Sequence, residues 1–177
     1  MTYEPKLHVL LSCDEIAAGV SRLAAEISRD YHAKRPVLIG VLKGSFIFLA
    51  DLVRQMDLPL EVDFVAISSY GAGTESCGQV NMLQSPCLNL CGRHVLIVED
   101  IIDTGLTTNF LLRYIHEQKA ASVKLCALTD KSLRRKVPVT IDYLGFSVPD
   151  KFIVGYGIDC NEEFRNLPDI RYMKEEK

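Results

Sequence analysis

The sequence predicts an α/β fold in which a parallel β-sheet core is flanked by helices. Short apolar runs, rich in valine, leucine and isoleucine, alternate along the chain with longer segments whose apolar residues recur every three or four positions. The short runs are typical of strands buried on both faces of a parallel sheet, and the longer segments are typical of amphipathic helices. Because the two patterns alternate, the connections are expected to be crossovers between parallel strands.

The first elements are a strand at Leu7–Leu11 and an amphipathic helix over residues 13–33. Ser12 and Glu15 form a capping-box pattern at the start of this helix. The apolar residues behind them recur at helical spacing: Ile16, Val20, Leu23, Ile27 and Tyr31. This helix is expected to pack on the core without a direct functional role.

The rest of the chain is expected to continue the alternation. Further strands are predicted at residues 37–42, 62–68, 80–83, 95–98, 123–128, 141–146 and 152–154, and further helices at residues 45–55 and after Gly105. Residues 159–177 are polar and are expected to be irregular. The N- and C-terminal segments should form a small hood over the carboxyl ends of the strands.

Composition restricts the class of protein. The chain has 177 residues and a net charge of −3, and it is expected to form one domain, residues 1–177. The acidic balance gives no indication of a nucleic-acid or membrane surface, and no apolar run approaches the roughly 18 residues of a membrane span. Residues 1–6 lack a signal-peptide pattern, so a cytoplasmic location with free cysteine thiols is expected.

Residues 95–108 are the stretch around which the predicted site is organised. Four apolar residues are followed by Glu99 and Asp100, then by a short turn around Gly105, and then by an apolar helix. Open α/β sheets bind ligands at the carboxyl ends of their strands. A turn that opens onto a helix N-terminus presents backbone N–H groups to an anion, and the hydroxyls of Thr104 and Thr107 can add donors.

Acidic residues beside an anion cradle need a particular ligand. Glu99 and Asp100 would repel a bare phosphate, but they suit a ligand that carries hydroxyl groups or arrives with a divalent cation. A sugar phosphate with free ribose hydroxyls and Mg²⁺ meets both conditions. Two adjacent acids taken alone are equally compatible with solvated residues at a strand end.

Three further features each allow two interpretations. Lys43 and Gly44 at a strand end could bring backbone N–H groups to an anion, or could be a surface lysine with a turn glycine. Residues 69–78 contain three glycines and form either a mobile loop or a plain connection. Lys131 is either a ligand donor or a solvated member of the basic run that continues to Lys136.

The run from Glu99 to Thr107 resembles the binding motif for 5-phosphoribosyl-1-pyrophosphate (PRPP) of type I phosphoribosyltransferases, in the form of their hypoxanthine-guanine branch. The resemblance implies that Glu99 and Asp100 hold the ribose hydroxyls and Mg²⁺. It also implies that Asp103 acts as acid or base near the purine. The 5′-phosphate would be cradled by the turn at Asp103, Thr104, Gly105, Leu106 and Thr107.

The pyrophosphate end also matches the family. Lys43 and Gly44 resemble its pyrophosphate-binding loop, and Arg165 aligns with an arginine that contacts pyrophosphate. The segment that begins at Ser69 and Tyr70 resembles the flexible loop that closes over the active site. Such a lid would keep water away from a transition state with oxocarbenium character.

The resemblance extends to the purine end. Lys131 would donate to the 6-oxo group, Phe152 would stack on the base, and the Ile153 backbone would bond its edge. Asp159 would assist Mg²⁺ through water or directly. A buried lysine has no acceptor, so a 6-amino base would leave it unpaired. The implied activity is transfer of the phosphoribosyl group from PRPP to hypoxanthine or guanine, with Mg²⁺ as cofactor and a homodimer or homotetramer as the assembly.

The resemblance covers about residues 7–170, with two departures. Asn81 stands where many relatives carry a basic residue, and Ser85 stands where an acid is common. The segment around Cys87 and Cys91 is uncharged, so the contacts made there are not implied by the family. Two alternatives stay open: a preference for xanthine or for hypoxanthine alone, and an RNA-binding regulator built on the same fold. The second should show a basic face, whereas this chain is acidic.

Overall fold

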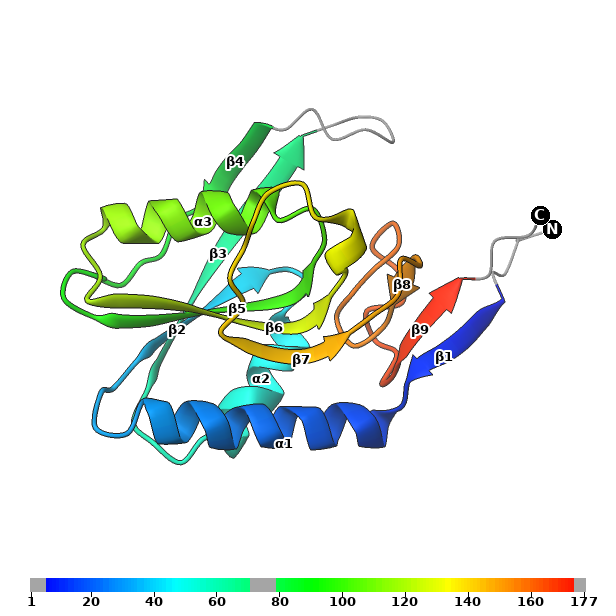
Figure 1. The fold of residues 1–177 in the computed structure, drawn as a ribbon, viewed down its shortest axis with the longest axis horizontal. Coiled ribbons are helices and arrows are strands. Elements are labelled where there is room, and N and C mark those ends of the chain that lie inside the picture. The colour runs from blue at the N-terminus through cyan, green and yellow to red at the C-terminus, as the bar shows by residue number, and fades with distance from the viewer. Residues whose placement is uncertain (1–5, 71–78, 174–177) are drawn as a thin grey trace.

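A computed structural model of the chain describes residues 6–70 and 79–173. The elements in chain order are β1 (Leu7–Leu11), α1 (Cys13–Asp30), β2 (Val37–Leu42), α2 (Phe46–Gln55), β3 (Glu61–Tyr70), β4 (Gln79–Gln84), β5 (His94–Ile102), α3 (Leu106–Glu117), β6 (Ser122–Asp130), a 3-10 turn (Ser132–Arg134), β7 (Tyr143–Ser147), β8 (Ile153–Val154) and β9 (Ile170–Met173). The alternation of strands and helices expected from the sequence is confirmed (Figure 1).

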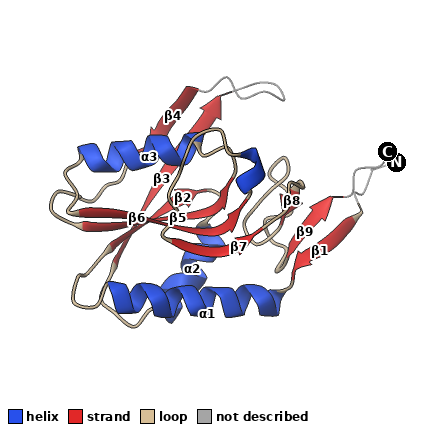
Figure 2. Cartoon of the chain, viewed as in Figure 1, coloured by secondary structure: helices blue, strands red, loops and turns tan. Residues whose placement is uncertain are grey.

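The core is a six-stranded sheet with the order β4-β3-β2-β5-β6-β7. The pairs β3-β2, β2-β5, β5-β6 and β6-β7 are parallel. The edge strand β4 pairs with β3 in the antiparallel direction. One face of the sheet is covered by α3, and the opposite face by α1 and α2 (Figures 1 and 2). The α/β fold with helices on both faces is therefore confirmed.

The central strands β2 and β5 carry uninterrupted apolar runs, Val37–Leu42 and residues 95–98, because both of their faces are buried there. Leu38 and Leu96, which are register partners on β2 and β5, belong to the cluster that packs under α1 and α2. Ile39 and Ile97, the next pair along the same strands, belong to the cluster under α3. Successive side chains of a strand point to opposite faces, so the uninterrupted apolar runs supply both clusters.

Helix α1 begins at the predicted capping box. The Glu15 N–H donates to Ser12 Oγ at 3.3 Å, and the Ser12 N–H donates to Glu15 Oε2 at 2.8 Å. The helix ends at Asp30 rather than at residue 33 as expected. Ala33 and Arg35 adopt positive φ angles of 64° and 45°, and the following Pro36 disfavours helical backbone at the residue before it.

The hood is a second, three-stranded sheet with the order β1-β9-β8. It stands at the end of the molecule where β5 and β6 finish, as the sequence predicts (Figure 1). The expectation that residues 159–177 are irregular is wrong for β9, in which Met173 pairs with Leu7. The partner strand is about 160 residues away in the chain, and so the short segment Ile170–Met173 carries no local signal strong enough to reveal it.

Other boundaries differ more modestly. Strand β5 continues through Glu99 and Asp100 to Ile102, and β7 begins at Tyr143 rather than at residue 141. The segment that departs from the family pattern is held by Asp63, whose Oδ2 accepts hydrogen bonds from the backbone N–H groups of Cys87 at 2.7 Å and Leu88 at 2.8 Å.

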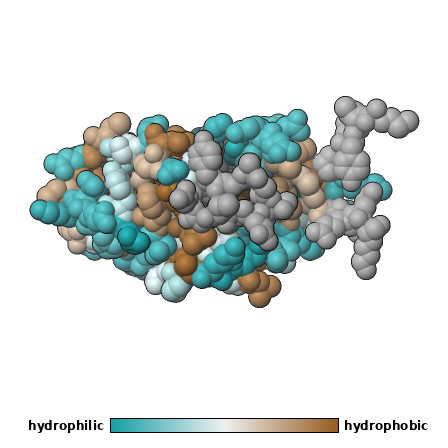
Figure 3. Space-filling model, turned by 90° about the horizontal axis from the view of Figure 1, so that it is seen from above, coloured by the Kyte–Doolittle hydropathy of each residue, from teal (hydrophilic) through white to brown (hydrophobic). Residues whose placement is uncertain are grey.

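The outer surface is largely polar on the side shown in Figure 3. Large apolar side chains are nevertheless exposed at Val9, Phe46, Val62, Leu83, Leu133 and Phe152. Across residues 6–70 and 79–173, the helices are all too short or too polar to span a membrane.

Candidate active site

The turn after β5 presents an open helix N-terminus. Gly105 is the N-cap of α3 and has a φ of +82°. A β-carbon at this position would press on Arg135, Val139 and the carbonyl oxygen of Val137, so glycine suits both the conformation and the space. Glycine offers no side-chain cap, and the Leu106 N–H makes only a long hydrogen bond to Thr104 Oγ1, at 3.4 Å, so this helix start can still receive an anion beside Thr104 and Thr107.

Two carboxylates lie directly before this turn and inside β5. The Glu99 side chain is only 5% exposed, and that of Asp100 is partly buried. Burial raises the pKa of Glu99, and the neighbouring Asp100 charge raises it further. Burial also raises the pKa of Asp100, against the opposing effect of the Arg165 guanidinium. The pair is therefore arranged to receive a cation, a proton or hydroxyl donors.

Glu99 and Asp100 suit a Mg²⁺ ion that is held partly by the protein and partly by water and substrate. Within the described ranges, no three His, Cys, Asp or Glu side chains are gathered into a group that could hold a metal ion by themselves. Asp159 is nevertheless near enough for its charge to raise the pKa of Asp100. Mg²⁺ is commonly bound through one or two carboxylates, several waters and the phosphates of a substrate. The donor set fits that arrangement and does not form an all-protein metal cage.

The loop after β2 packs directly against these acids. A β-carbon on Gly44 would overlap the Asp100 carboxylate, and one on Gly157 would overlap the Gly44 carbonyl oxygen. The peptide bond between Leu42 and Lys43 is cis. The predicted placement of Lys43 and Gly44 at the same edge as Asp100 is confirmed by this packing.

The loop between β8 and β9 contributes a cluster of opposite charges to the same edge. Arg165 donates from Nη1 to the Gly157 carbonyl oxygen at 2.8 Å, and its Nη2 lies 2.9 Å from Asp159 Oδ1. Glu162 accepts from Arg165 Nη2 at 2.9 Å and from Lys43 Nζ at 2.9 Å. The structure thus brings Lys43, Asp159 and Arg165 together. Glu162 is a member that the sequence reasoning missed, because one of two adjacent glutamates in a polar segment carries no distinguishing signal.

A second polar group lies where β6 ends. Lys131 is only 5% exposed, and its backbone N–H donates to the Ile102 carbonyl oxygen at 2.9 Å. Burial lowers the pKa of the Lys131 ammonium, and the nearby Asp103 carboxylate opposes this effect. Asp103 Oδ2 also lies 3.3 Å from Arg134 Nη1, and Arg134 Nε lies 3.7 Å from Asp150 Oδ1. Arg134 was missed, since the sequence shows it only as part of a basic run.

The remaining predicted residues lie at β8, at the end of β3 or outside the described part of the chain. Phe152 is 53% exposed, as a platform for a stacked ring would be, and Ile153 begins β8. Ser69 and Tyr70 end β3, where they pair with Val80 and Gln79. The side chains of Ser69 and Tyr70 and the whole of residues 71–78, on which the loop prediction falls, lie outside the described residues.

Comparison with known proteins agrees with this geometry. Residues 10–161 match the family model described as the phosphoribosyl transferase domain. A hypoxanthine-guanine phosphoribosyltransferase of Streptococcus pneumoniae is 48% identical over 168 residues, which are 95% of this chain and 93% of the relative. The protein of the same name from Bacillus subtilis is 45% identical over 166 residues, 94% of this chain and 92% of the relative.

Solved structures of related proteins have the same fold as this chain. A crystal structure of a hypoxanthine-guanine phosphoribosyltransferase from Bacillus anthracis superposes with a TM-score of 0.91 at 46% identity, covering 97% of this chain and all of that one. A hypoxanthine phosphoribosyltransferase from Trypanosoma cruzi gives a TM-score of 0.90 at 39% identity, covering 98% and 94%. Site geometry, sequence and fold agree, and the chain belongs to the phosphoribosyltransferase family.

Proposed function

We propose that this chain, acting as one domain of residues 1–177, transfers the 5-phosphoribosyl group of PRPP to hypoxanthine or guanine. The products would be the nucleoside monophosphate, IMP or GMP, and pyrophosphate, which is a purine salvage reaction. The observation that carries the proposal is the shared edge at which the open N-terminus of α3 and the buried Glu99–Asp100 pair lie near Lys131. The names of the relatives support the same reaction.

The PRPP would be held at three points. Its 5′-phosphate would lie in the turn of Asp103, Thr104, Gly105, Leu106 and Thr107, and its ribose hydroxyls would donate to Glu99 and Asp100. Its pyrophosphate would contact Lys43, the Gly44 backbone and Arg165, together with Ser69 and Tyr70. Binding at points remote from the reacting carbon orients that carbon for attack by the base.

Mg²⁺ is the proposed cofactor, and Glu99, Asp100 and Asp159 are the residues that would hold it. When bound, it would neutralise charge on the leaving pyrophosphate. The raised pKa values of Glu99 and Asp100 support this assignment, since a buried pair of carboxylates is stabilised by a neighbouring cation. Lys43 and Arg165 would add positive charge on the pyrophosphate side.

The purine would lie between Phe152 and the end of β6. Phe152 would stack on the ring, the Ile153 backbone would bond its edge, and Lys131 would donate to the 6-oxo oxygen. Sites that require a hydrogen bond can reject an analogue that lacks the partner by about 10⁴–10⁵. Asp103 would take the proton of purine N7 as the new glycosidic bond forms, which is general base catalysis.

The RNA-binding alternative loses its main support in the structure. Its basic cluster is engaged within the molecule, since Arg134 pairs with Asp103 and Asp150, and Arg135 pairs with Asp130. We therefore propose small molecules as the substrates, with a homodimer or homotetramer in the cytoplasm as the working form, on the strength of family membership.

The direct test is product formation. Purified protein is incubated with PRPP, MgCl₂ and hypoxanthine, and both IMP and pyrophosphate are quantified. We expect the two products in equal amounts, and no release of either after chelation of Mg²⁺ with EDTA or when hypoxanthine is omitted. Release of pyrophosphate without a nucleotide, or no product from folded protein that binds PRPP, would refute the proposed reaction.

A further inference from the structure

Glu162 forms ion pairs with both of the cations that the proposed function assigns to pyrophosphate. One of its carboxylate oxygens, Oε1, lies 2.9 Å from Lys43 Nζ, and the other, Oε2, lies 2.9 Å from Arg165 Nη2. Lys43 comes from the loop after β2 and Arg165 from the loop between β8 and β9. A single carboxylate therefore bridges an ammonium and a guanidinium, which is the position expected for two oxygens of a diphosphate.

The backbone around Glu162 directs this side chain toward the cations. Cys160 and Glu163 exchange backbone hydrogen bonds, at 3.2 Å and 3.0 Å, across a tight reverse turn. Asn161 and Glu162 within that turn have φ angles of 51° and 68°, a region that residues other than glycine seldom adopt. The Glu162 N–H also donates to Asp159 Oδ2 at 2.8 Å, so the turn that carries Glu162 is anchored to the site itself.

The bridge is open to solvent at Lys43 and Glu162 and less so at Arg165, whose side chain is 19% exposed. The side chains of Lys43 and Glu162 are 66% and 63% exposed. Exposed ion pairs contribute little to folding because water and salt screen them. A ligand with more negative charge than one carboxylate would therefore displace Glu162 from Lys43 and Arg165 without unfolding the loop.

We propose that Glu162 is an internal counter-ion of the pyrophosphate subsite, and that it competes with pyrophosphate for Lys43 and Arg165. This inference rests on the proposed function, because it takes these two cations as pyrophosphate ligands. Glu162 thereby weakens the binding of free pyrophosphate and pairs the two cations again when that product leaves. A competing state of this kind lowers the apparent affinity by the fraction of molecules that it occupies.

The test compares two neutralising variants of adjacent residues. Glu162→Gln removes the charge from the bridge, and Glu163→Gln removes the same charge from the next residue, whose side chain is exposed. The dissociation constant of inorganic pyrophosphate is measured by calorimetry at fixed ionic strength with excess MgCl₂. We expect it to fall about three- to tenfold in E162Q and to stay at the wild-type value in E163Q.

A third and fourth variant locate the effect. Glu162→Ala removes both carboxylate oxygens and should also tighten pyrophosphate binding, which gives an independent measurement if E162Q is poorly folded. Lys43→Met removes one of the contested cations, so the gain produced by E162Q should shrink when both changes are combined. The KM for hypoxanthine should be unaltered in E162Q, because the bridge lies at the pyrophosphate end.

The outcomes separate this inference from the proposed function. If E162Q and E162A bind pyrophosphate no more tightly than E163Q while the wild type forms IMP, the counter-ion role is refuted and the reaction stands. If the wild type neither binds pyrophosphate nor forms IMP, the proposed function fails and the counter-ion role fails with it. Tighter pyrophosphate binding in E162Q and E162A but not in E163Q, together with IMP formation by the wild type, supports both the counter-ion role and the proposed function.

Discussion

Gly44 shows how the site depends on one missing methyl group. Its backbone lies so close to Asp100 that a β-carbon would overlap the carboxylate. The neighbouring Lys43 contacts Glu162, and Gly157 of the loop between β8 and β9 packs on the Gly44 carbonyl oxygen. Three segments of the chain therefore meet at this glycine, and the position of the proposed pyrophosphate loop relative to the acids depends on it.

Gly44→Ala should impair catalysis far more than stability. The added methyl group must push the loop or Asp100 aside, and a displacement of about 1 Å can cost about 10²-fold in rate. We expect kcat/KM for PRPP to fall about 10²-fold. Gly92→Ala is the control, because Gly92 has a positive φ of 72° but open space around it and lies away from the site. It should lower the melting temperature and leave kcat/KM unchanged; equal activity losses in both variants would contradict this account.

Asp103 is the residue whose chemistry the proposal uses most directly. Asp103→Ala should lower kcat by about 10²–10⁴, the usual contribution of a general base. PRPP binding should be largely kept, because the turn holds phosphate mainly through backbone N–H groups. Steady-state kinetics give the turnover and calorimetry gives the PRPP affinity. Unchanged turnover would remove Asp103 from the mechanism.

At the residue scale, sequence reasoning reached those members of the site that lie in a motif. The carboxylates and the turn after β5 could be predicted from the order strand, acids, glycine and helix. Glu162 and Arg134 could not, because each acts through partners that are close only in the folded chain, such as Lys43 and Asp103. The sequence leaves two interpretations of Lys131 open, and its burial favours a ligand donor over a solvated lysine.

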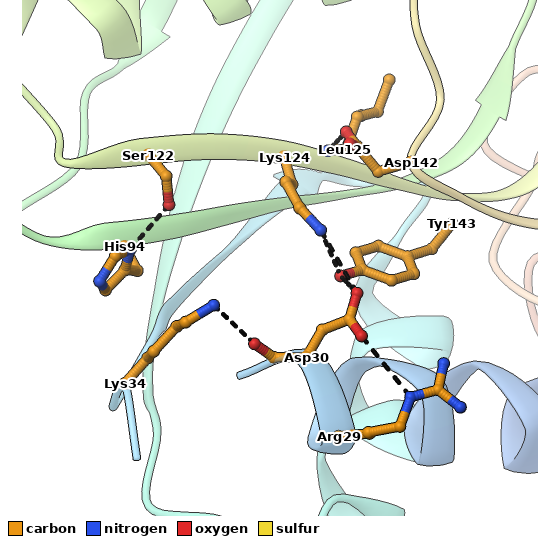
Figure 4. A network of polar contacts seen from close by, with 9 residues as sticks. All are labelled: Arg29, Asp30, Lys34, His94, Ser122, Lys124, Leu125, Asp142 and Tyr143. Atoms are coloured by element: carbon orange, nitrogen blue, oxygen red, sulfur yellow. Dashed lines mark hydrogen bonds and ion pairs between the residues drawn. The ribbon is translucent and has the colours of Figure 1, made fainter. Parts of the chain in front are cut away.

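A network of polar contacts ties the end of α1 to β6 and β7 at the edge opposite the site (Figure 4). Asp30 Oδ2 accepts from Tyr143 Oη at 2.8 Å and lies 3.4 Å from Lys124 Nζ. Lys124 also donates to Tyr143 Oη at 2.9 Å, and its ammonium lies over the Tyr143 ring, 4.9 Å from the centroid. These contacts link the helix to the sheet independently of the apolar core.

This network predicts a pH-dependent contribution to stability. The hydrogen bond from Tyr143, with help from Lys124, lowers the pKa of Asp30. A carboxyl with a lowered pKa in the folded state stabilises the protein above its unfolded pKa of about 3.9, and this contribution is lost as the pH falls through the folded pKa. Because the Asp30 side chain is 36% exposed, solvent screens part of this effect, and Asp30→Asn should lower the free energy of unfolding at pH 7 by about 0.5 kcal/mol, or about 1–2 °C in Tm.

Thermal unfolding at a series of pH values checks this prediction. The difference between wild type and D30N should shrink as the pH falls below about 3.9 and should disappear once the pH is below the lowered folded-state pKa of Asp30. Asp57→Asn, which removes the same charge from an exposed residue after α2, should change Tm little at any pH. A loss in D30N that is constant with pH would show that the Asp30 charge is not the source of the stability.

At the scale of elements, prediction succeeded where a pattern was local. The capping box fixed the start of α1 within one residue, and the apolar runs located β2, β5 and β6. It failed for β9, whose pairing with β1 is the longest-range contact of the fold, and for the end of α1, which depends on backbone angles at Ala33 and Arg35. Long-range partners and special backbone angles leave no periodic signal.

The whole molecule divides its tasks between two sheets. The six-stranded sheet carries the phosphate turn, the acids and Lys131 on the ends of β5 and β6, and the three-stranded hood brings Ile153 on β8 and stands beside the loops that carry Phe152 and Arg165 (Figure 1). The proposed purine and pyrophosphate contacts thus come from both sheets, so the substrates would lie between them. The sequence predicts where the hood lies, but it does not predict how the strands of the hood pair.

The most direct measurement is a base panel with one enzyme preparation. Hypoxanthine, guanine, xanthine and adenine are offered separately with PRPP and Mg²⁺, and nucleotide formation is followed. The account predicts turnover with hypoxanthine and guanine, and kcat/KM for adenine lower by about 10⁴ or more, because adenine would leave the buried Lys131 donor unpaired. Adenine used as well as hypoxanthine, or turnover with none of the four bases, would contradict it.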